Sequence, residues 1–367
     1  MAASRPLASA RRDSILRLLQ ARGSVRVSEL AETLDVAEMT VRRDLVAMDK
    51  AGLLRRTHGG AEALDADAGA VVQPSNGKAI HPAARTKRIG MLVPDMNFYW
   101  PEVARGAEQA ANDAGYLLAL RVGSYETVDE RPTLAPLYDD PDVVGVLAVI
   151  RTDSPNYAQV AEWLQNQDKP TVLVERDARH GQYAEPFESV VSDHEYGAGL
   201  GIHYLAELGH KRVGGAVCAG SPHREKIRAG WREAAKSHDL EIGVDVLIPS
   251  NTSPEFPGEL KKLVKRIKQT GTTGILAHSD PEAMALVQAL QEAGLSVPED
   301  VSVLSYDDGI AELFTPALTA IHPPRSSLGL TSVEMLLSRI ADPGLPVRKA
   351  SLIPSLVVRG STAGPRS

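Results

Sequence analysis

Polar and aromatic side chains gather where short apolar runs of the sequence end. They are Asp95, Asn97, Phe98, Tyr99, Trp100, Glu175, Arg176, Asp307 and Asp308. Carboxylates accept paired hydrogen bonds from neighbouring hydroxyls, and aromatic rings pack on the apolar face of a sugar ring or a base. Aromatic residues make up only 4% of the chain, so three in a row are unusual. The set favours binding of a carbohydrate or nucleoside, and a hydrophobic plug between two lobes is the alternative for the aromatic residues.

A second group of candidates lies near the N-terminus, in a segment with helical periodicity. Val41, Leu45 and Met48 fall on one face of this helix, so Arg42, Arg43 and Lys50 project from the other, with Met39 and Thr40 near its start. Such side chains reach base edges in a major groove. The alternative is the solvated face of a structural helix.

A basic hairpin follows this helix and favours DNA contact over a solvated structural face. Arg55, Arg56 and His58 lie in a predicted strand and turn, so phosphate or groove contacts come from two elements on one side of a small domain. Through Gly60 the chain has 11 Lys and Arg residues against 7 Asp and Glu, whereas the remainder has 29 against 40. This asymmetry predicts a basic module for double-stranded DNA attached to an acidic body.

Catalytic and metal-binding patterns are not found in the sequence. No glycine-rich phosphate loop follows the first apolar strand, and no cluster of metal ligands has workable spacing. We expect His194, His203, His210 and His223 to be surface or locally satisfied residues, and the single cysteine, Cys218, to be an inert thiol. The sequence therefore predicts no enzyme activity, no cofactor and no metal.

Targeting features are also missing. The N-terminal segment lacks the apolar stretch of a signal peptide, and no run of about 20 apolar residues predicts a membrane span. We expect a cytoplasmic protein without a membrane partner.

In the second half of the chain, short apolar runs alternate with segments of helical periodicity. Predicted strands are 89–93, 116–120, 143–150, 171–174, 213–218, 274–277 and 301–304, with a helix ending near Ala114 after the first. Apolar strands separated by amphipathic helices indicate an α/β fold with parallel sheets covered on both faces. So many units predict two doubly wound lobes, with a ligand between them at the carboxyl ends of the strands.

The N-terminal elements predict a winged helix-turn-helix. A helix spans 13–20, a short helix follows Ser28 as N-cap, a third helix covers about 37–51, and a strand at 53–56 turns back at 57–60. The segment after Ala61 is rich in Ala, Gly, Pro and Asp. We therefore expect a DNA-binding domain at 1–64, a linker at 65–86 and a ligand-binding domain at 87–360.

The first module resembles a known family. The segment SVRVSELAETLDVAEMTVRRDLVAMDKAGLLRRTHGGA is similar to the DeoR-type winged helix-turn-helix, with TVRRDL matching its recognition helix and RTHGGA its wing. The resemblance implies DNA contact by Arg42, Arg43 and the wing. Ala37 stands where the family usually has the serine that caps the recognition helix.

The second half resembles the effector domain of LacI/GalR-type repressors. The segments RIGMLVPD, ELGHKRV, VPEDVSV and YDD carry the likeness, which covers about Arg88 to Arg359. It implies a fold like periplasmic sugar-binding proteins, a homodimer, and ligand positions at Glu175, Ser279 and Asp307. Ser279 replaces a common asparagine. The family's ligand-binding arginine falls on Ile227, with Arg224 and Arg228 displaced to either side, so the resemblance does not identify the effector.

Together these features predict a DNA-binding transcription regulator, a repressor that responds to a sugar or nucleoside. The alternatives are a sugar-binding protein of a transport system and an activator instead of a repressor.

Overall fold

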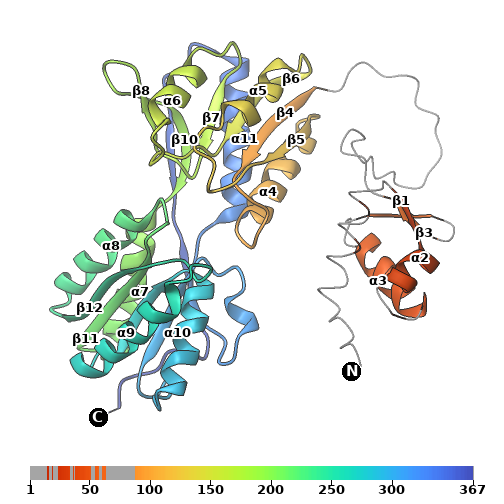
Figure 1. The fold of residues 1–367 in the computed structure, drawn as a ribbon. Helices are drawn as coiled ribbons and strands as arrows, with labels where there is room; N and C mark the ends of the chain where they lie inside the picture. The colour runs from red at the N-terminus through yellow and green to blue at the C-terminus, as the bar shows by residue number, and fades with distance from the viewer. Residues whose placement is uncertain are drawn as a thin grey trace. The chain divides into compact units, whose positions relative to one another are not determined.

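The computed structural model describes residues 15, 19, 24–33, 36, 38–50, 54–57, 60–62 and 87–366. The chain divides into two compact units, Met1–Pro82 and Ala83–Ser367 (Figure 1). The predicted boundaries at residues 64, 86 and 360 stay predictions.

The first unit combines two short helices with a small antiparallel sheet. Its described elements are β1 (Ser24–Arg26), α2 (Val27–Thr33), α3 (Glu38–Lys50), β2 (Arg55–Thr57) and β3 (Gly60–Glu62). The strand order is β1-β3-β2. Val41, Leu45 and Met48 of α3 are at most 1% exposed and share a core with Ile15 and Leu19. The helical periodicity therefore identified the buried face of α3 correctly.

Two details of this unit differ from the predictions. Ser28 is the second residue of α2 and not its N-cap, because β1 pairs with β3 and leads directly into the helix. The strand predicted at 53–56 begins only at Arg55, because Leu54 is 2% exposed and belongs to the core. A Cβ on Gly60 would lie 2.2 Å from the carbonyl oxygen of Val25, so glycine is needed where β3 meets β1.

The second unit contains two six-stranded sheets. The first sheet has the order β16-β10-β7-β6-β4-β5 and the second β12-β11-β13-β14-β15-β17. The strands of the first are β4 (Arg88–Val93), β5 (Leu117–Val122), β6 (Val143–Ala148), β7 (Thr171–Val174), β10 (Glu188–Ser192) and β16 (Lys349–Leu352). Those of the second are β11 (Arg212–Cys218), β12 (Glu241–Ile248), β13 (Gly274–His278), β14 (Ser302–Tyr306), β15 (Thr319–His322) and β17 (Ser355–Val357). All neighbouring strands in these two sheets are parallel except β15 and β17, which confirms the predicted two-lobed α/β class.

Helices pack on both sheets and define two lobes. In the first lobe these are α4 (Trp100–Asp113), α5 (Arg131–Asp139), α6 (Tyr157–Gln165) and α11 (Arg325–Ala341); a hairpin of β8 (Arg179–His180) and β9 (Glu185–Pro186) accompanies them. In the second lobe they are α7 (His194–Glu207), α8 (Arg224–Ser237), α9 (Phe256–Thr270), α10 (Asp280–Glu292) and the 3-10 turn η1 (Ala311–Leu313). The chain crosses between lobes after β10, β15 and β16 (Figure 1).

Alternating side chains of the central strands enter cores on opposite faces of a sheet. Ile89 and Met91 of β4 pack in the core beneath α4 and α11, whereas Leu92 packs in the core beneath α5 and α6. The expected coverage on both faces is wrong for the edge strand β5, where Leu117 and Val122 are 46% and 50% exposed. No described helix combines the length and the apolar character that a membrane crossing requires.

Candidate functional site

The outward face of α3 presents the residues predicted to contact DNA. Met39 is 62% exposed, Arg42 and Arg43 are exposed, and Thr40 is half-buried. Lys50 is the last residue of α3, and Arg55 and Arg56 form the start of β2. The side chains of these three residues, and the whole of His58, lie outside the described residues. The helix thus exposes two adjacent arginines opposite its core face.

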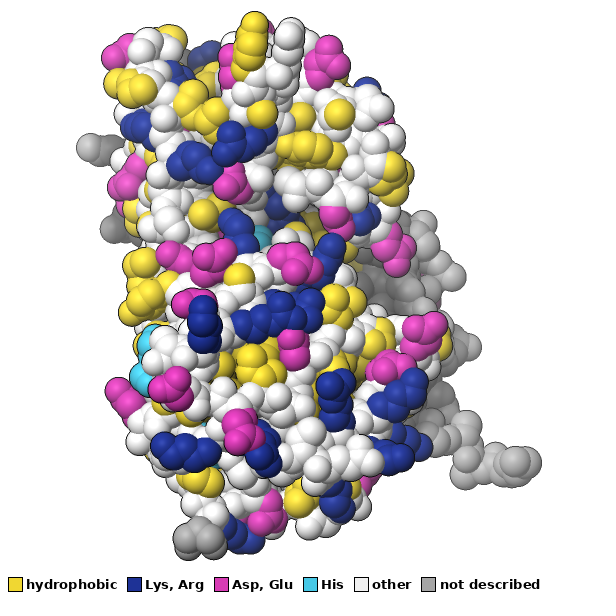
Figure 2. Space-filling view, turned by 90° about the vertical axis from the view of Figure 1, so that its left-hand side faces the viewer, with side chains coloured by type: hydrophobic (Ala, Val, Ile, Leu, Met, Phe, Trp, Pro, Cys, Tyr) yellow, Lys and Arg dark blue, Asp and Glu magenta, His cyan; other side chains and the backbone are white. Residues whose placement is uncertain are grey.

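One face of the molecule carries surface charges of both signs. Figure 2 shows one face, on which Lys and Arg side chains are interspersed with Asp and Glu side chains. Intermixed charges of both signs give little net attraction for a phosphate backbone. This face does not present an extended basic surface.

Three acidic residues that follow strands have left-handed backbone conformations. Glu175 after β7 has φ 55°, and Asp307 and Asp308 after β14 have φ 103° and 52°. Non-glycine residues adopt this region at an energetic cost and tend to do so at functional sites. The strand ends therefore place these carboxylates in unusual, fixed positions.

Glu175 is the centre of a buried hydrogen-bond network between the lobes. Its carboxylate accepts hydrogen bonds from the Tyr99 hydroxyl at 2.5 Å, from the Ser192 hydroxyl at 2.6 Å and from the Ser192 amide at 3.1 Å. The His194 Nε2 atom lies 3.2 Å from Glu175 Oε2. Burial alone would raise the pKa of Glu175, but the charge of His194 and these hydrogen bonds lower it well below its ordinary value.

The next residue, Arg176, connects the first lobe to a histidine of the second. Arg176 is 3% exposed and donates to the carbonyl oxygens of Ile150 and Glu175. Its Nη1 atom also lies 3.2 Å from Nε2 of His223, whose ring stacks on that of His194 with centroids 3.9 Å apart. Burial and the charge of His194 lower the pKa of His223 well below its ordinary value, so this imidazole is neutral and accepts from the guanidinium.

Asp307 lies in the second lobe, beside His278 and Tyr306. Its carboxylate is 4.0 Å from His278 Nε2, and its main-chain carbonyl accepts a hydrogen bond from Arg325 of α11. Burial, followed by the negative charge of Asp280, raises the pKa of Asp307 well above its ordinary value. Burial lowers the pKa of His278 to about 4, and its Nδ1 atom is buried without a hydrogen-bond partner. These groups can donate and accept hydrogen bonds.

The aromatic segment after β4 divides between the cleft and the core. Tyr99 reaches Glu175, but Trp100 is 2% exposed, packs in the first-lobe core and donates from its indole to the Tyr125 hydroxyl at 2.8 Å. Phe98 packs on Gly309 of the second lobe, where a Cβ would lie 2.5 Å from the ring. Asp95 accepts from the amide of Asn97 in a turn, and both are at least partly exposed.

The remaining predicted ligand residues are held by neighbours within the second lobe. Arg228 pairs with Asp245 of β12 at 3.0 Å. Arg224 donates to the carbonyl oxygens of Ala219 and Ser221. The Ser279 hydroxyl donates to Glu282 at 2.7 Å at the start of α10. None of these contacts joins the network around Glu175.

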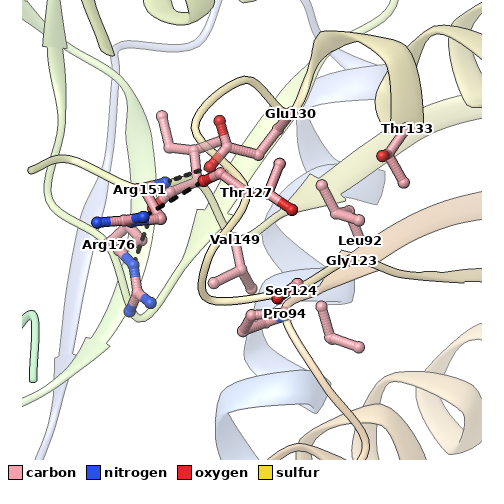
Figure 3. Close-up of a pocket in the computed structure, with 12 residues that line it drawn as sticks. Leu92, Pro94, Gly123, Ser124, Thr127, Glu130, Thr133, Val149, Arg151 and Arg176 are labelled. Atoms are coloured by element: carbon pink, nitrogen blue, oxygen red, sulfur yellow. Dashed lines mark hydrogen bonds between the residues drawn. The ribbon is translucent and has the colours of Figure 1, made fainter. Parts of the chain in front are cut away.

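A small pocket in the first lobe adjoins Arg176. Figure 3 shows Arg151 and Arg176 on one side and Leu92 on the other, with Glu130 above. Glu130 is 5% exposed; its Oε1 accepts from the Arg151 amide, whereas its buried Oε2 has no partner. Burial raises the pKa of this carboxyl. One carboxyl oxygen beside this pocket is therefore buried without a hydrogen-bond partner.

Sequence reasoning missed the histidines of the cleft. His194 and His223 are not scattered but stacked, and His194 also lies 3.1 Å from the Tyr306 hydroxyl. His203 is exposed and His210 is bonded to Thr273, as the predictions had them. A usable signal was present, since His194 follows β10 and His223 follows β11, at strand ends like the carboxylates.

Comparisons with known proteins agree with the two-part organisation. Residues 11–67 match the DeoR-like helix-turn-helix domain, and residues 202–362 match the periplasmic binding protein-like domain. The chain is 26% identical over 344 residues to the arabinose metabolism transcriptional repressor of Geobacillus stearothermophilus, covering 91% of this chain and 90% of that protein. It is 28% identical over 280 residues to the HTH-type transcriptional repressor PurR of Photobacterium profundum, covering 75% and 81%.

Solved structures resemble the second unit. A LacI family transcriptional regulator from Enterococcus faecium with bound ribose is 26% identical, covers 76% of this chain and 99% of that one, and superposes with a TM-score of 0.61. CcpA of Lactococcus lactis, at 21% identity and a TM-score of 0.61 over 76% of this chain and 99% of that one, shares the fold. The chain therefore combines a segment that matches the DeoR-like helix-turn-helix domain with a segment that matches the periplasmic binding protein-like domain, and it is similar over most of its length to transcriptional repressors.

Proposed function

We propose that this regulator is a repressor whose operator affinity is set by a small neutral effector bound between the two lobes. The observation that carries the proposal is the pairing of two exposed arginines on α3 of a DeoR-like module with a buried polar network that joins the two lobes of a periplasmic binding protein-like domain. Relatives that span most of the chain are repressors by name. Because it acts on the chromosome, we place it in the cytoplasm.

DNA contact is assigned to α3 and the hairpin that follows it. The residues are Met39, Thr40, Arg42, Arg43, Lys50, Arg55, Arg56 and His58. Arg42 and Arg43 are exposed on the face of α3 opposite the core, where a recognition helix meets the major groove. Arg55 and Arg56, on the hairpin, are assigned to phosphates.

Effector contact is assigned to both lobes. The residues are Asp95, Asn97, Phe98, Tyr99, Glu175, Arg176, Arg224, Arg228, Ser279 and Asp307; Trp100, predicted with them, is not included because it is buried in the first-lobe core. Among them Tyr99, Glu175, Arg176 and Asp307 have the strongest support, because they surround the buried network between the lobes. A sugar or nucleoside suits a site with carboxylate acceptors and no phosphate-binding loop, and ribose is bound in a similar structure.

The lobes supply a means of coupling effector to DNA. Arg176 with His223, and Glu175 with His194, are direct contacts between lobes that an effector entering the cleft must replace or rearrange. An effector that prefers one lobe arrangement shifts the population toward it. In a homodimer, this changes the spacing of the two DNA-binding modules. The exposed apolar side chains of β5 provide surface for dimer contact.

A solute-binding protein of a transport system is the second candidate, favoured by the effector fold alone. Fragments of genomic DNA bound by the purified chain distinguish the two functions, and the genes beside the bound sites indicate candidate effectors. Failure to select any sequence at low salt, with or without sugars, would contradict the repressor proposal. Stronger binding in the presence of effector, with increased transcription, would indicate an activator.

Asp307→Asn tests the effector site directly. The amide keeps the shape but cannot present the two acceptors of the ionised carboxylate, the form that hydroxyl donors of an effector would favour, so we expect effector binding to weaken by about 1.5–3 kcal/mol while operator binding persists. Calorimetry with the sugar or nucleoside that alters DNA binding measures this, with Asp113→Asn on the exposed face of α4 as control. Unchanged affinity would place the effector elsewhere, and preference for a phosphorylated sugar would contradict a neutral effector.

A further inference from the structure

Three side chains of the kinds that bind transition metals meet in the cleft. Glu175 follows β7, His194 begins α7 and His223 precedes α8. One ligand atom from each lies within 4.8 Å of the other two. Glu175 and His194 are 1% and 2% exposed, so water competes little for these atoms. Two imidazole nitrogens and one carboxylate oxygen form a donor set that suits zinc and related divalent ions.

The neighbours of His194 are compatible with metal binding through its Nε2 atom. The Tyr306 hydroxyl lies 3.1 Å from His194 Nδ1 and 3.5 Å from the main-chain carbonyl of His194; when it donates to this carbonyl, its oxygen accepts from Nδ1. Nδ1 then carries the hydrogen, and in the neutral ring Nε2 presents its lone pair to Glu175. A metal-binding histidine is typically held in this way, through a hydrogen bond from its second nitrogen.

In this tautomer two acceptor atoms face each other across 3.2 Å, His194 Nε2 and Glu175 Oε2. Such a pair requires a positive charge between its members, which is either a proton on the imidazole or a bound cation. Ligand atoms that are each about 2.0–2.1 Å from one tetrahedral ion lie roughly 3.3 Å apart. The separation in this structure is thus already that of two ligands of one ion.

We propose that the cleft binds one divalent transition metal ion through Glu175, His194 and His223, and that the ion's fourth position faces the effector space. The rings of His194 and His223 are tilted by only 25°, so both cannot direct a nitrogen at one ion as they stand. His223 must turn about its side-chain bonds and leave Arg176. Because Arg176 belongs to the first lobe and His223 to the second, metal binding removes a contact between lobes.

The test uses the full chain, freed of metal with a chelator and titrated with Zn²⁺ by calorimetry and with Co²⁺ by visible absorption. We expect one tight site per chain with a tetrahedral Co²⁺ spectrum. His223→Ala and His194→Gln should each weaken binding by at least about tenfold. Arg176→Met should strengthen it, because the guanidinium no longer holds His223. Fluorescence of Trp100, Trp163 and Trp231 reports whether each variant is folded.

The matched control is the double variant His203→Ala, His238→Ala. These two histidines contact each other on the exposed surface of α7 and α8, away from the cleft network, and form a second place where a metal can bind. Loss of binding in this control, with retention in His223→Ala, would move the ion to the surface and overturn the proposal. Absence of any tight binding would show that a proton alone lies between His194 and Glu175. Neither measurement contains DNA or sugar, so the result does not depend on the proposed function.

Discussion

At both proposed sites, the environment of single residues determines which contacts they can make. In the DNA-binding module, two adjacent arginines project from a helix whose other face is buried. Between the lobes, burial shifts the pKa values of carboxyl and imidazole groups away from their values in water: the pKa of Asp307 is raised and the pKa values of His223 and His278 are lowered. A neutral imidazole or carboxylic acid offers hydrogen bonds that its charged form does not. The environment of each residue therefore determines what it can bind.

Arg42→Ala and Arg43→Ala test base recognition. At least one should lose about 1–3 kcal/mol of discrimination between operator and random DNA, because an arginine that grips a guanine edge makes two hydrogen bonds that no other base pair reproduces. Arg55→Ala or Arg56→Ala should weaken binding to both DNAs alike. Fluorescence anisotropy with operator and scrambled duplexes measures the difference. Equal losses on both duplexes for the two helix variants would mean that Arg42 and Arg43 contact only phosphates.

His278→Gln tests the pH dependence of the effector domain. The folded-state pKa of His278, about 4, is below its unfolded value of about 6.5, so the unfolded chain binds a proton first as the pH falls. This removes about 2 kcal/mol of stability between pH 7 and pH 5. Glutamine does not titrate in this range, so between pH 7 and pH 5 the variant should lose about 2 kcal/mol less stability than the unmodified protein. Urea unfolding followed by tryptophan fluorescence reports this domain alone, because Trp100, Trp163 and Trp231 all lie after residue 86. Parallel stability curves for the two proteins would contradict the assignment.

Secondary-structure elements bring these residues together through close packing. Helix α4 comes from the beginning of the second unit and α11 from near its end, and each has a glycine where the two helices cross. A Cβ on Gly329 would lie 2.0 Å from the carbonyl oxygen of Val103, and one on Gly106 would lie 2.0 Å from that of Ser326. Arg325, which begins α11, pairs with Glu102 of α4 and donates to the main chain of Asp307. The position of α11 against α4 therefore affects the cleft.

Gly329→Ala tests this packing. The added methyl group meets main-chain atoms that cannot rotate away, so α11 must shift, and we expect a loss of about 1–3 kcal/mol in the free energy of unfolding. Gly258→Ala in α9 is the matched control, because a Cβ there has no atom within 4 Å and alanine favours a helix. Thermal unfolding of both variants makes the comparison. Equal stability of the two variants would show that the crossing tolerates a wider separation.

At the scale of the whole molecule, the chain separates DNA attraction from ligand sensing. The excess of positive charge lies in the first 60 residues, whereas the remainder is acidic. The acidic body repels phosphates and leaves the basic module as the attractive surface. The proposed effector site depends on both lobes, because the contacts around Glu175 and Arg176 cross between them.

A fragment ending near Leu64 should bind DNA alone but more weakly than the full chain. It contains the basic helix and hairpin, while the proposed dimer contacts lie beyond it. Its affinity should fall steeply as salt rises, because each neutralised phosphate releases counterions. Anisotropy titrations of fragment and full chain at several salt concentrations measure both effects. Equal affinities would contradict a contribution from dimerisation.

The sequence by itself determined the elements and their class. Periodicity identified the buried face of α3, and apolar runs located β4, β7, β11 and β13 within a few residues, because local patterns record which face of an element is buried. It did not reveal β10, β12 or β17, whose strands are short or lie near sheet edges with partly polar faces. Edge exposure, as in β5, depends on which strands are neighbours.

Only the tertiary structure decided which side chains share the cleft. Glu175, His194 and His223 are far apart in the chain and have no common spacing, yet the crossing after β10 brings them within reach of one another. Trp100 follows the same aromatic pattern as Tyr99 but is buried in the first-lobe core, because consecutive residues of a helix start point in different directions. A sequence pattern indicates which face of an element is buried. It does not indicate which strand ends lie next to each other, because the order of the strands in the sheets and the crossings between lobes determine that.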